Sequence, residues 1–150
     1  MSVDCKLVDY DCIALKLRDV ISLTDKFYSR KIKELGLPIL MNHIPLFYIL
    51  SDSEQPLAFT DIYNTWEISK SSLSEVINKY HNMGFVEKIL STEDKRSFTV
   101  VLTEEGQKIR EELDRISEQL LTKFYSNFDN TTRDKFEKNV DHIISNLRDI

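Results

Sequence analysis

The sequence predicts one mainly α-helical domain with a single small β-hairpin, and three observations support this fold class. Its 150 residues are 41% apolar and 30% charged, a composition typical of a compact globular protein. Only 3 glycines and 3 prolines interrupt the chain, which is too few for a loop-rich β-sandwich or a glycine-rich phosphate loop. Apolar residues recur every three or four positions over much of the length, as on one face of a helix.

Long amphipathic helices are expected at both ends of the chain. The first covers residues 7–35 and stops at Gly36. Another follows Thr103, its expected cap, and the last begins in a capping box over Thr131–Asp134. Apolar stripes on helices longer than a compact core favour a homodimer joined through both ends of the sequence. A monomer that folds these helices onto its own core is the alternative.

The middle of the chain predicts three short helices followed by two strands. The helices cover Asn42–Leu50, Thr60–Trp66 and Ser69–Gly84. Asn42 is the expected cap of the first helix, and Pro45 lies within its first turn, where a missing amide hydrogen costs little. Strands at residues 85–90 and 98–103 enclose a charged loop and would form a hairpin with a projecting tip.

The third short helix has one apolar and one polar face. The inward stripe is expected to contain Leu73, Val76, Ile77, Tyr80 and Met83. The outward residues are Lys70, Ser71, Ser74, Glu75, Asn78 and Asn82. Short Ser and Asn side chains let a helix approach base edges, Asn can pair with adenine through two hydrogen bonds, and the N-terminus at Ser69 can receive a phosphate. An ordinary solvated face is the alternative.

The loop between the two strands carries Lys95 and Arg96 beside Asp94. Arginine suits the narrow, negatively charged minor groove of DNA, and a nearby carboxylate can orient its guanidinium group. A loop tip that is merely polar is the alternative, since surface turns are commonly charged.

From Leu57 to Ile109 the sequence resembles the winged helix-turn-helix core of the MarR family of bacterial transcriptional regulators. The resemblance is carried by LAFTDIYNTWEISKSSLSEVINKYHNMGFVEKI, by the loop with Asp94, Lys95 and Arg96, and by Leu102-Thr103-Glu104-Glu105-Gly106, which opens a long helix. The order of the flanking helices also agrees, so the resemblance covers nearly the whole chain.

This resemblance implies a single domain over residues 1–150, with a winged helix-turn-helix module at 56–103 and long dimerisation helices at 7–50 and 104–150. It implies a sequence-specific transcriptional regulator that binds a pseudo-palindromic operator in double-stranded DNA as a homodimer. The residues implied to face the major groove or its phosphates are Ser69, Lys70, Ser71, Ser72, Ser74 and Asn78. In the wing, Arg96 would lie at the minor groove, with Asp94 orienting it and Lys95 on the DNA backbone.

Charge favours a rival hypothesis, a MarR-like dimeric adaptor that binds a protein and no DNA. The chain has a net charge of -5, and residues 56–103 hold six acidic against five basic residues. Glu75 places a negative charge on the outward face, where the family often has a basic residue. Ala58 and Glu67 also depart from the family pattern, at a helix start and in the turn before the third helix.

Many MarR relatives respond to small aromatic or phenolic ligands, which bind between the dimerisation helices and the DNA-binding module. The residues expected to line such a pocket here are Tyr28, His43, Phe47, Tyr48 and Trp66. Core packing accounts for these aromatic residues equally well.

The sequence favours no enzyme, cofactor or metal site. No nucleophile with its base and no phosphate loop is recognisable, and His43, His81 and His142 lack metal-ligand spacing. Cys5 and Cys12 are too few for a disulfide framework and are expected to be thiols. The acidic N-terminus does not resemble a secretory signal and no apolar run is long enough to span a bilayer, so a cytoplasmic protein is expected.

Overall fold

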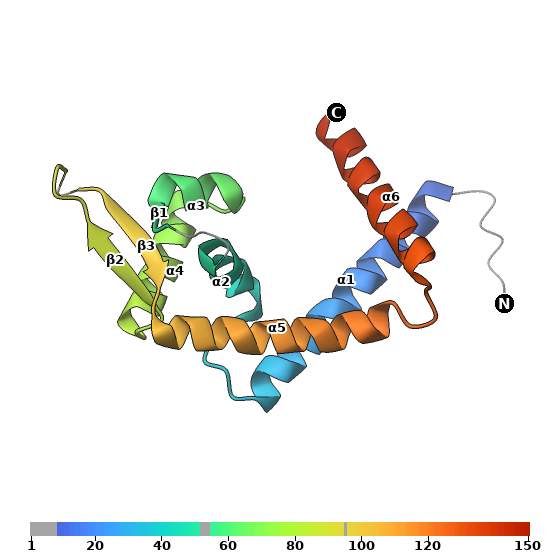
Figure 1. The fold of residues 1–150 in the computed structure, drawn as a ribbon. Coiled ribbons are helices and arrows are strands. Elements are labelled where there is room, and N and C mark those ends of the chain that lie inside the picture. The colour runs from blue at the N-terminus through green and yellow to red at the C-terminus, as the bar shows by residue number, and fades with distance from the viewer. Residues whose placement is uncertain (1–8, 52–54, 95) are drawn as a thin grey trace. The chain divides into compact units, whose positions relative to one another are not determined.

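A computed structural model describes residues 9–51, 55–94 and 96–150, with the backbone alone for residues 9–12 (Figure 1). The chain divides into two compact units, Met1–Ile116 and Ser117–Ile150. The helix α5 (Glu104–Phe124) contributes its first part to one unit and its last part to the other. Each unit is therefore described by itself.

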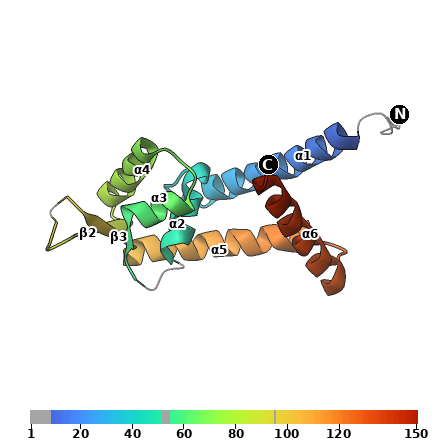
Figure 2. The ribbon, with the colours of Figure 1, turned by 90° about the horizontal axis from the view of Figure 1, so that it is seen from above.

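The first unit contains the expected long helix, the short helices and the hairpin. In chain order its further elements are α1 (Asp9–Glu34), the 3-10 turn η2 (Met41–His43), α2 (Ile44–Ser51), β1 (Leu57–Ala58), α3 (Phe59–Thr65), α4 (Lys70–Asn82), β2 (Val86–Leu90) and β3 (Phe98–Leu102). In both ribbon views α4 lies beside the β2–β3 hairpin, at the end of the unit where α5 begins (Figures 1 and 2). The predicted mainly helical fold with one hairpin is confirmed.

A third strand, β1, was not expected from the sequence. The sheet has the order β1-β3-β2, and both pairings are antiparallel. Leu57 of β1 lies opposite Val100, and Val86 of β2 lies opposite Leu102. Because β1 has only two residues, it has no alternating pattern of its own and exists through its pairing with β3.

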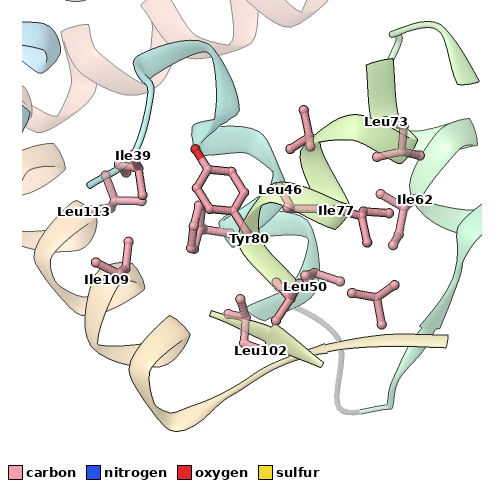
Figure 3. Close-up of a cluster of buried hydrophobic side chains, with 14 of the residues drawn as sticks. Ile39, Leu46, Leu50, Ile62, Leu73, Ile77, Tyr80, Leu102, Ile109 and Leu113 are labelled. Carbon is pink, nitrogen blue, oxygen red and sulfur yellow. The ribbon is translucent and has the colours of Figure 1, made fainter. Parts of the chain in front are cut away.

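The core of the first unit surrounds the side chain of Tyr80, which is fully buried (Figure 3). Phe47 of α2 packs edge-on against it, with 5.2 Å between ring centroids. Apolar side chains from α2, α3, α4, β3 and α5 complete the cluster, among them Leu46, Leu50, Ile62, Leu73, Ile77, Leu102, Ile109 and Leu113. The apolar faces predicted for α4 and for the start of α5 therefore meet in one core.

The start of α2 corrects one prediction. Asn42 does not cap this helix, because it lies inside the η2 turn, which leads directly into α2. Pro45 does lie in the first turn of α2, as expected. The η2 turn itself begins after Leu40, which offers no side-chain cap.

The junction between α4, β2 and α5 depends on Thr103 and two glycines. Gly84 has a φ of 80° and ends α4 in the left-handed conformation that glycine favours. The Thr103 hydroxyl donates to the Gly84 carbonyl at 2.6 Å and accepts the Gly106 amide at 3.1 Å, so Thr103 caps α5 as predicted. A side chain at position 106 would lie 2.1 Å from the Phe85 carbonyl oxygen, which explains why glycine occupies this helical position.

The second unit contains the end of α5 and the helix α6 (Asn130–Arg148). The predicted capping box over Thr131–Asp134 is wrong. The cap is Asp129, whose carboxylate accepts the Thr132 amide at 2.7 Å. An aromatic cluster of Phe124, Tyr125, Phe128 and Phe136 joins the two helices.

No helix in the described part of the chain is both long enough and apolar enough to cross a membrane.

Candidate nucleic-acid interface

Helix α4 begins at a cluster of serines. Ser69 is its cap, and the Ser69 hydroxyl accepts the Ser72 amide at 3.1 Å. The same hydroxyl donates to the Ser72 hydroxyl at 2.8 Å and lies 3.2 Å from that of Ser71. The Ser69 hydroxyl is thus engaged within the protein. The hydroxyl groups of Ser71 and Ser72 can still form hydrogen bonds to an external partner.

The two faces of α4 are as predicted except at the end of the helix. Leu73, Val76, Ile77 and Tyr80 are buried. Met83, expected in this stripe, is 39% exposed, because α4 ends at Asn82 and Met83 lies outside the last turn. The opposite face exposes Lys70, Ser71, Ser74, Glu75, Asn78 and Asn82. The core therefore fixes which side chains α4 presents to an external partner.

The tip of the β2–β3 hairpin, the wing, is organised by Asp94. One carboxylate oxygen of Asp94 accepts the Arg96 amide at 2.9 Å, and the other accepts the Ser97 hydroxyl at 3.1 Å. The Ser97 amide in turn donates to the Asp94 carbonyl at 3.0 Å. Asp94 thus shapes the backbone that carries Arg96, whose side chain is exposed. Lys95, the other predicted wing contact, lies outside the described residues.

The wing and α4 meet at a cleft of about 360 Å³. Ser74 of α4 and Arg96 of the wing both line it. Phe59 and Phe98 also line it, with their ring centroids 6.2 Å apart. The structure thus brings one predicted major-groove residue and the predicted minor-groove arginine to a single surface.

Asn78 has a partner that the sequence did not suggest. The ammonium group of Lys88, on β2, donates a hydrogen bond to the side-chain oxygen of Asn78. Lys88 is ten residues away in the chain and belongs to another element, so no helical spacing could have indicated this pair.

Tyr80 ties α4 to the segment that precedes α2. Its hydroxyl lies 2.9 Å from Nδ1 of His43 and accepts the Leu40 amide at 3.2 Å. Burial, and secondarily the charge of Lys79, lowers the pKa of His43, which favours the neutral ring. Burial raises the pKa of Tyr80, although the bond from Leu40 opposes this effect. Nδ1 of the neutral ring can accept a hydrogen bond from the Tyr80 hydroxyl, so all three groups are satisfied.

Comparison with known proteins identifies this arrangement. Residues 39–106 match the winged helix DNA-binding domain family, a span that includes α2, the sheet, α3 and α4. Over these residues the chain has a winged-helix fold.

Most of the chain is also similar to known transcriptional regulators. The HTH-type transcriptional regulator BilQ of Clostridioides difficile is 20% identical over 109 residues, 73% of each chain. A MarR regulator from Methanosarcina mazei has a TM-score of 0.78 at 21% identity, covering 93% of this chain and 99% of that one. AbsC, a MarR family regulator from Streptomyces coelicolor, has a TM-score of 0.79 at 22% identity, with 95% and 97% covered. The resemblance to the MarR family is thus confirmed in the fold.

Within this winged-helix protein, the aromatic residues predicted to line a ligand pocket are distributed around the core. Phe47 is fully buried against Tyr80, and His43 is bonded to the same tyrosine. The Arg110 guanidinium lies 3.9 Å from the centre of the Tyr48 ring. Tyr28 and Trp66 are partly buried and pack against the core cluster. The structure brings His43 and Phe47 together at Tyr80, and a ligand there would have to displace packed side chains.

Within the described residues, the cysteines and histidines form no metal site. Cys5 and the side chain of Cys12 lie outside them. The described part of the winged-helix protein has no group of three or more His, Cys, Asp or Glu residues that could hold a metal ion.

Proposed function

We propose that the protein is a sequence-specific transcriptional regulator that acts as a homodimer on a pseudo-palindromic operator in the cytoplasm of a bacterium. The observation that carries the proposal is the exposed polar face of α4, which shares a cleft with the wing arginine in a winged helix DNA-binding domain. The proposal assigns no catalytic role and no cofactor to any residue.

In this proposal α4 enters the major groove and the wing lies at the minor groove. Ser71 and Ser74 are short enough to let the helix approach base edges closely, and Asn78 can bond to a base. Lys70, whose ammonium lies 5.4 Å from the centre of the Tyr63 ring, can reach a phosphate. Arg96 suits a narrow minor groove. Since the module is not basic overall, most of its affinity must come from such specific contacts.

The homodimer is supported by apolar side chains that the single chain leaves in water. In the first unit α1 exposes Ile13, Leu15, Leu17, Val20, Ile21 and Leu23. In the second unit α6 exposes Ile143, Ile144 and Leu147. Exposed apolar surface of this extent marks an interface, and a second copy of the chain is the partner that gives two α4 helices for a pseudo-palindrome.

Release by a small aromatic ligand is a further part of the proposal. Tyr28, His43, Phe47, Tyr48 and Trp66 would contact the ligand, and a bound ring would disturb the packing around Tyr80 of α4. Titration of benzoate and phenol derivatives into the protein–operator complex tests it. Release that is lost on Phe47→Leu supports the pocket, whereas unchanged operator affinity with every compound contradicts it.

The main test is selection of DNA from a random-sequence pool with the full chain, followed by measurement of Kd for the selected site. Arg96→Ala should weaken binding to this site about tenfold or more, as expected for loss of a charge-assisted groove contact. Arg115→Ala, which removes an exposed arginine paired with Glu112 on α5, is the matched control. No selected sequence even at low salt would favour the protein adaptor instead.

The homodimer is tested separately by light scattering. Ile21→Glu places a charge at a 60% exposed position of α1 and should convert the dimer to a monomer with much weaker operator binding. Lys16→Glu changes a polar exposed residue of the same helix and should leave the dimer intact. A wild-type protein that is monomeric at micromolar concentration would contradict this part.

A further inference from the structure

Asn78 presents its amide to the solvent side of α4 with its oxygen already engaged. Lysine carries only hydrogen-bond donors, so the atom of Asn78 that accepts from Lys88 must be the oxygen. The NH2 group of the same amide cannot bond to the donor-only lysine and can donate to an external partner. The oxygen of Asn78 is thus identified by the donor chemistry of lysine as well as by its position.

The ammonium of Lys88 has a second contact that holds it in place. It lies 5.1 Å from the centre of the Phe98 ring, a cation–π distance. Phe98 lies in β3, opposite Leu90 at the end of β2, so both contacts of Lys88 belong to the folded module. Because Lys88 is half-buried and Asn78 is exposed, the lysine reaches Asn78 from the protein side.

We propose that Lys88 determines the base preference of Asn78, so that this position of the operator is guanine and not adenine. The inference rests on the proposed function, since it requires α4 in the major groove. Lys88 bonds to one lone pair of the amide oxygen, so that Asn78 and Lys88 together offer hydrogen-bond donors to the base.

The reason lies in the pattern of groups on each base. Adenine shows one acceptor and one donor in the major groove, and an asparagine reads both with its NH2 group and its oxygen. The Lys88 ammonium takes one of the two lone pairs of that oxygen and places a positive charge beside the other, which disfavours the N6 donor of adenine. Guanine shows two acceptors, N7 and O6. The Asn78 NH2 group together with the remaining N–H donors of Lys88 matches two acceptors. The pair therefore complements guanine, and its positive charge adds to that preference.

A phosphate contact by Lys88 would have a different signature. A lysine that only neutralises a phosphate strengthens binding to every DNA sequence alike. It adds about 0.9 to the slope of log affinity against log salt. A lysine that positions Asn78 changes the ratio between two bases at one operator position. The ratio therefore separates the two roles.

The experiment repeats the selection from random DNA with four full-length proteins: wild type, Asn78→Ala, Lys88→Met and Lys79→Met. Kd is then measured for operators with guanine or adenine at the position where Asn78→Ala loses preference. We expect wild type to prefer guanine about fivefold to a hundredfold, the range of one bidentate contact. Lys88→Met frees the amide oxygen and should shift the preference to adenine.

Two further variants make the result specific. Lys79→Met removes an exposed lysine of α4 itself and should keep the guanine preference while losing the same charge. Lys88→Arg keeps a cationic hydrogen-bond donor at this position and should also keep the guanine preference. Thermal unfolding of each variant within a few degrees of wild type shows that the altered preference comes from a folded protein.

Three results would overturn the inference. The first is a wild type that does not select guanine at the Asn78-dependent position. The second is a Lys88→Met variant that leaves the ratio unchanged while it weakens binding to all sequences alike, and the third is an Asn78→Ala variant that changes no position. In each of these cases wild type still selects a defined operator, so the proposed function stands. If wild type selects no sequence at all, the proposed function fails and this inference falls with it.

Discussion

The Tyr80 hydroxyl lies 2.9 Å from Nδ1 of His43, so the helix proposed to read DNA is hydrogen-bonded to the segment that precedes α2. The same hydroxyl accepts the Leu40 amide. One buried side chain of α4 thus satisfies two groups of a segment about forty residues earlier in the chain. The position of α4 depends on this polar anchor as well as on apolar packing.

Tyr80→Phe removes the anchor while keeping the ring. We expect the free energy of unfolding to fall by about 1–3 kcal/mol, because the Leu40 amide loses its partner in a partly buried place. Urea denaturation followed by circular dichroism measures this change. Tyr63→Phe, which alters a half-buried tyrosine of α3, is the control and should cost less. Equal losses in both variants would show that the hydroxyl of Tyr80 has no special role.

Stability should depend on pH through His43. Its pKa is lowered by burial and by the charge of Lys79, so the unfolded chain binds a proton at a higher pH than the folded protein does. The contribution of His43 to stability is thus present above its unfolded pKa, near 6.5, and is lost as the pH falls from there through its folded pKa. Unfolding free energies measured across this range should decrease toward acid. His43→Gln should flatten the decrease, and substitution of the exposed His142 should not.

Gly106→Ala should destabilise the protein although alanine normally favours a helix. The added carbon would lie 2.1 Å from the Phe85 carbonyl oxygen, so α5 or the start of β2 must shift. Overpacking of this kind costs about 1–3 kcal/mol. Thermal unfolding measures the loss, and Gln107→Ala at the next, exposed position of α5 is the control. An unchanged or raised melting temperature in Gly106→Ala would contradict the steric explanation.

Local signals in the sequence were sufficient for most helices. Ser69 and Gly84 are recognisable as the cap and the end of α4, and Thr103 as the cap of α5, because each function depends on one residue type at one position. The apolar spacing of α4 identified its four buried residues. Met83 was misassigned, since the spacing continues for one residue beyond the helix.

The features that the sequence did not reveal depend on residues far apart in the chain. Strand β1 is formed by pairing with β3, about forty residues later, and has no pattern of its own. The bond between Lys88 and Asn78 likewise requires β2 to pack beside α4. At α6 the capping residue is Asp129, which lies before the predicted box Thr131–Asp134, because the helix begins at Asn130. The predicted DNA contacts that lie within the described residues, which exclude Lys95, are all exposed, and their roles are predictions.

Asp94 can support the wing either through its hydrogen bonds or through its charge, and substitutions distinguish the two. Asp94 accepts the Arg96 amide and the Ser97 hydroxyl, and both bonds need polar atoms but no charge. Asp94→Asn can replace both, because its amide oxygen accepts from Arg96 and its NH2 group can donate to Ser97. We therefore expect Asp94→Asn to bind the selected operator about as well as wild type.

Asp94→Ala removes both bonds and loosens the backbone that carries Arg96. Loss of one or two neutral hydrogen bonds corresponds to a drop of about tenfold in operator affinity. Both substitutions remove the same negative charge and therefore increase the general attraction to DNA equally. The ratio of the Kd values of the two variants is then free of this effect. If instead the Asp94 charge orients the Arg96 guanidinium, as the sequence suggested, Asn and Ala should weaken binding equally. Fluorescence anisotropy with labelled operator measures both Kd values. An Asn variant that binds about tenfold more tightly than the Ala variant supports the backbone role, and equal Kd values contradict it.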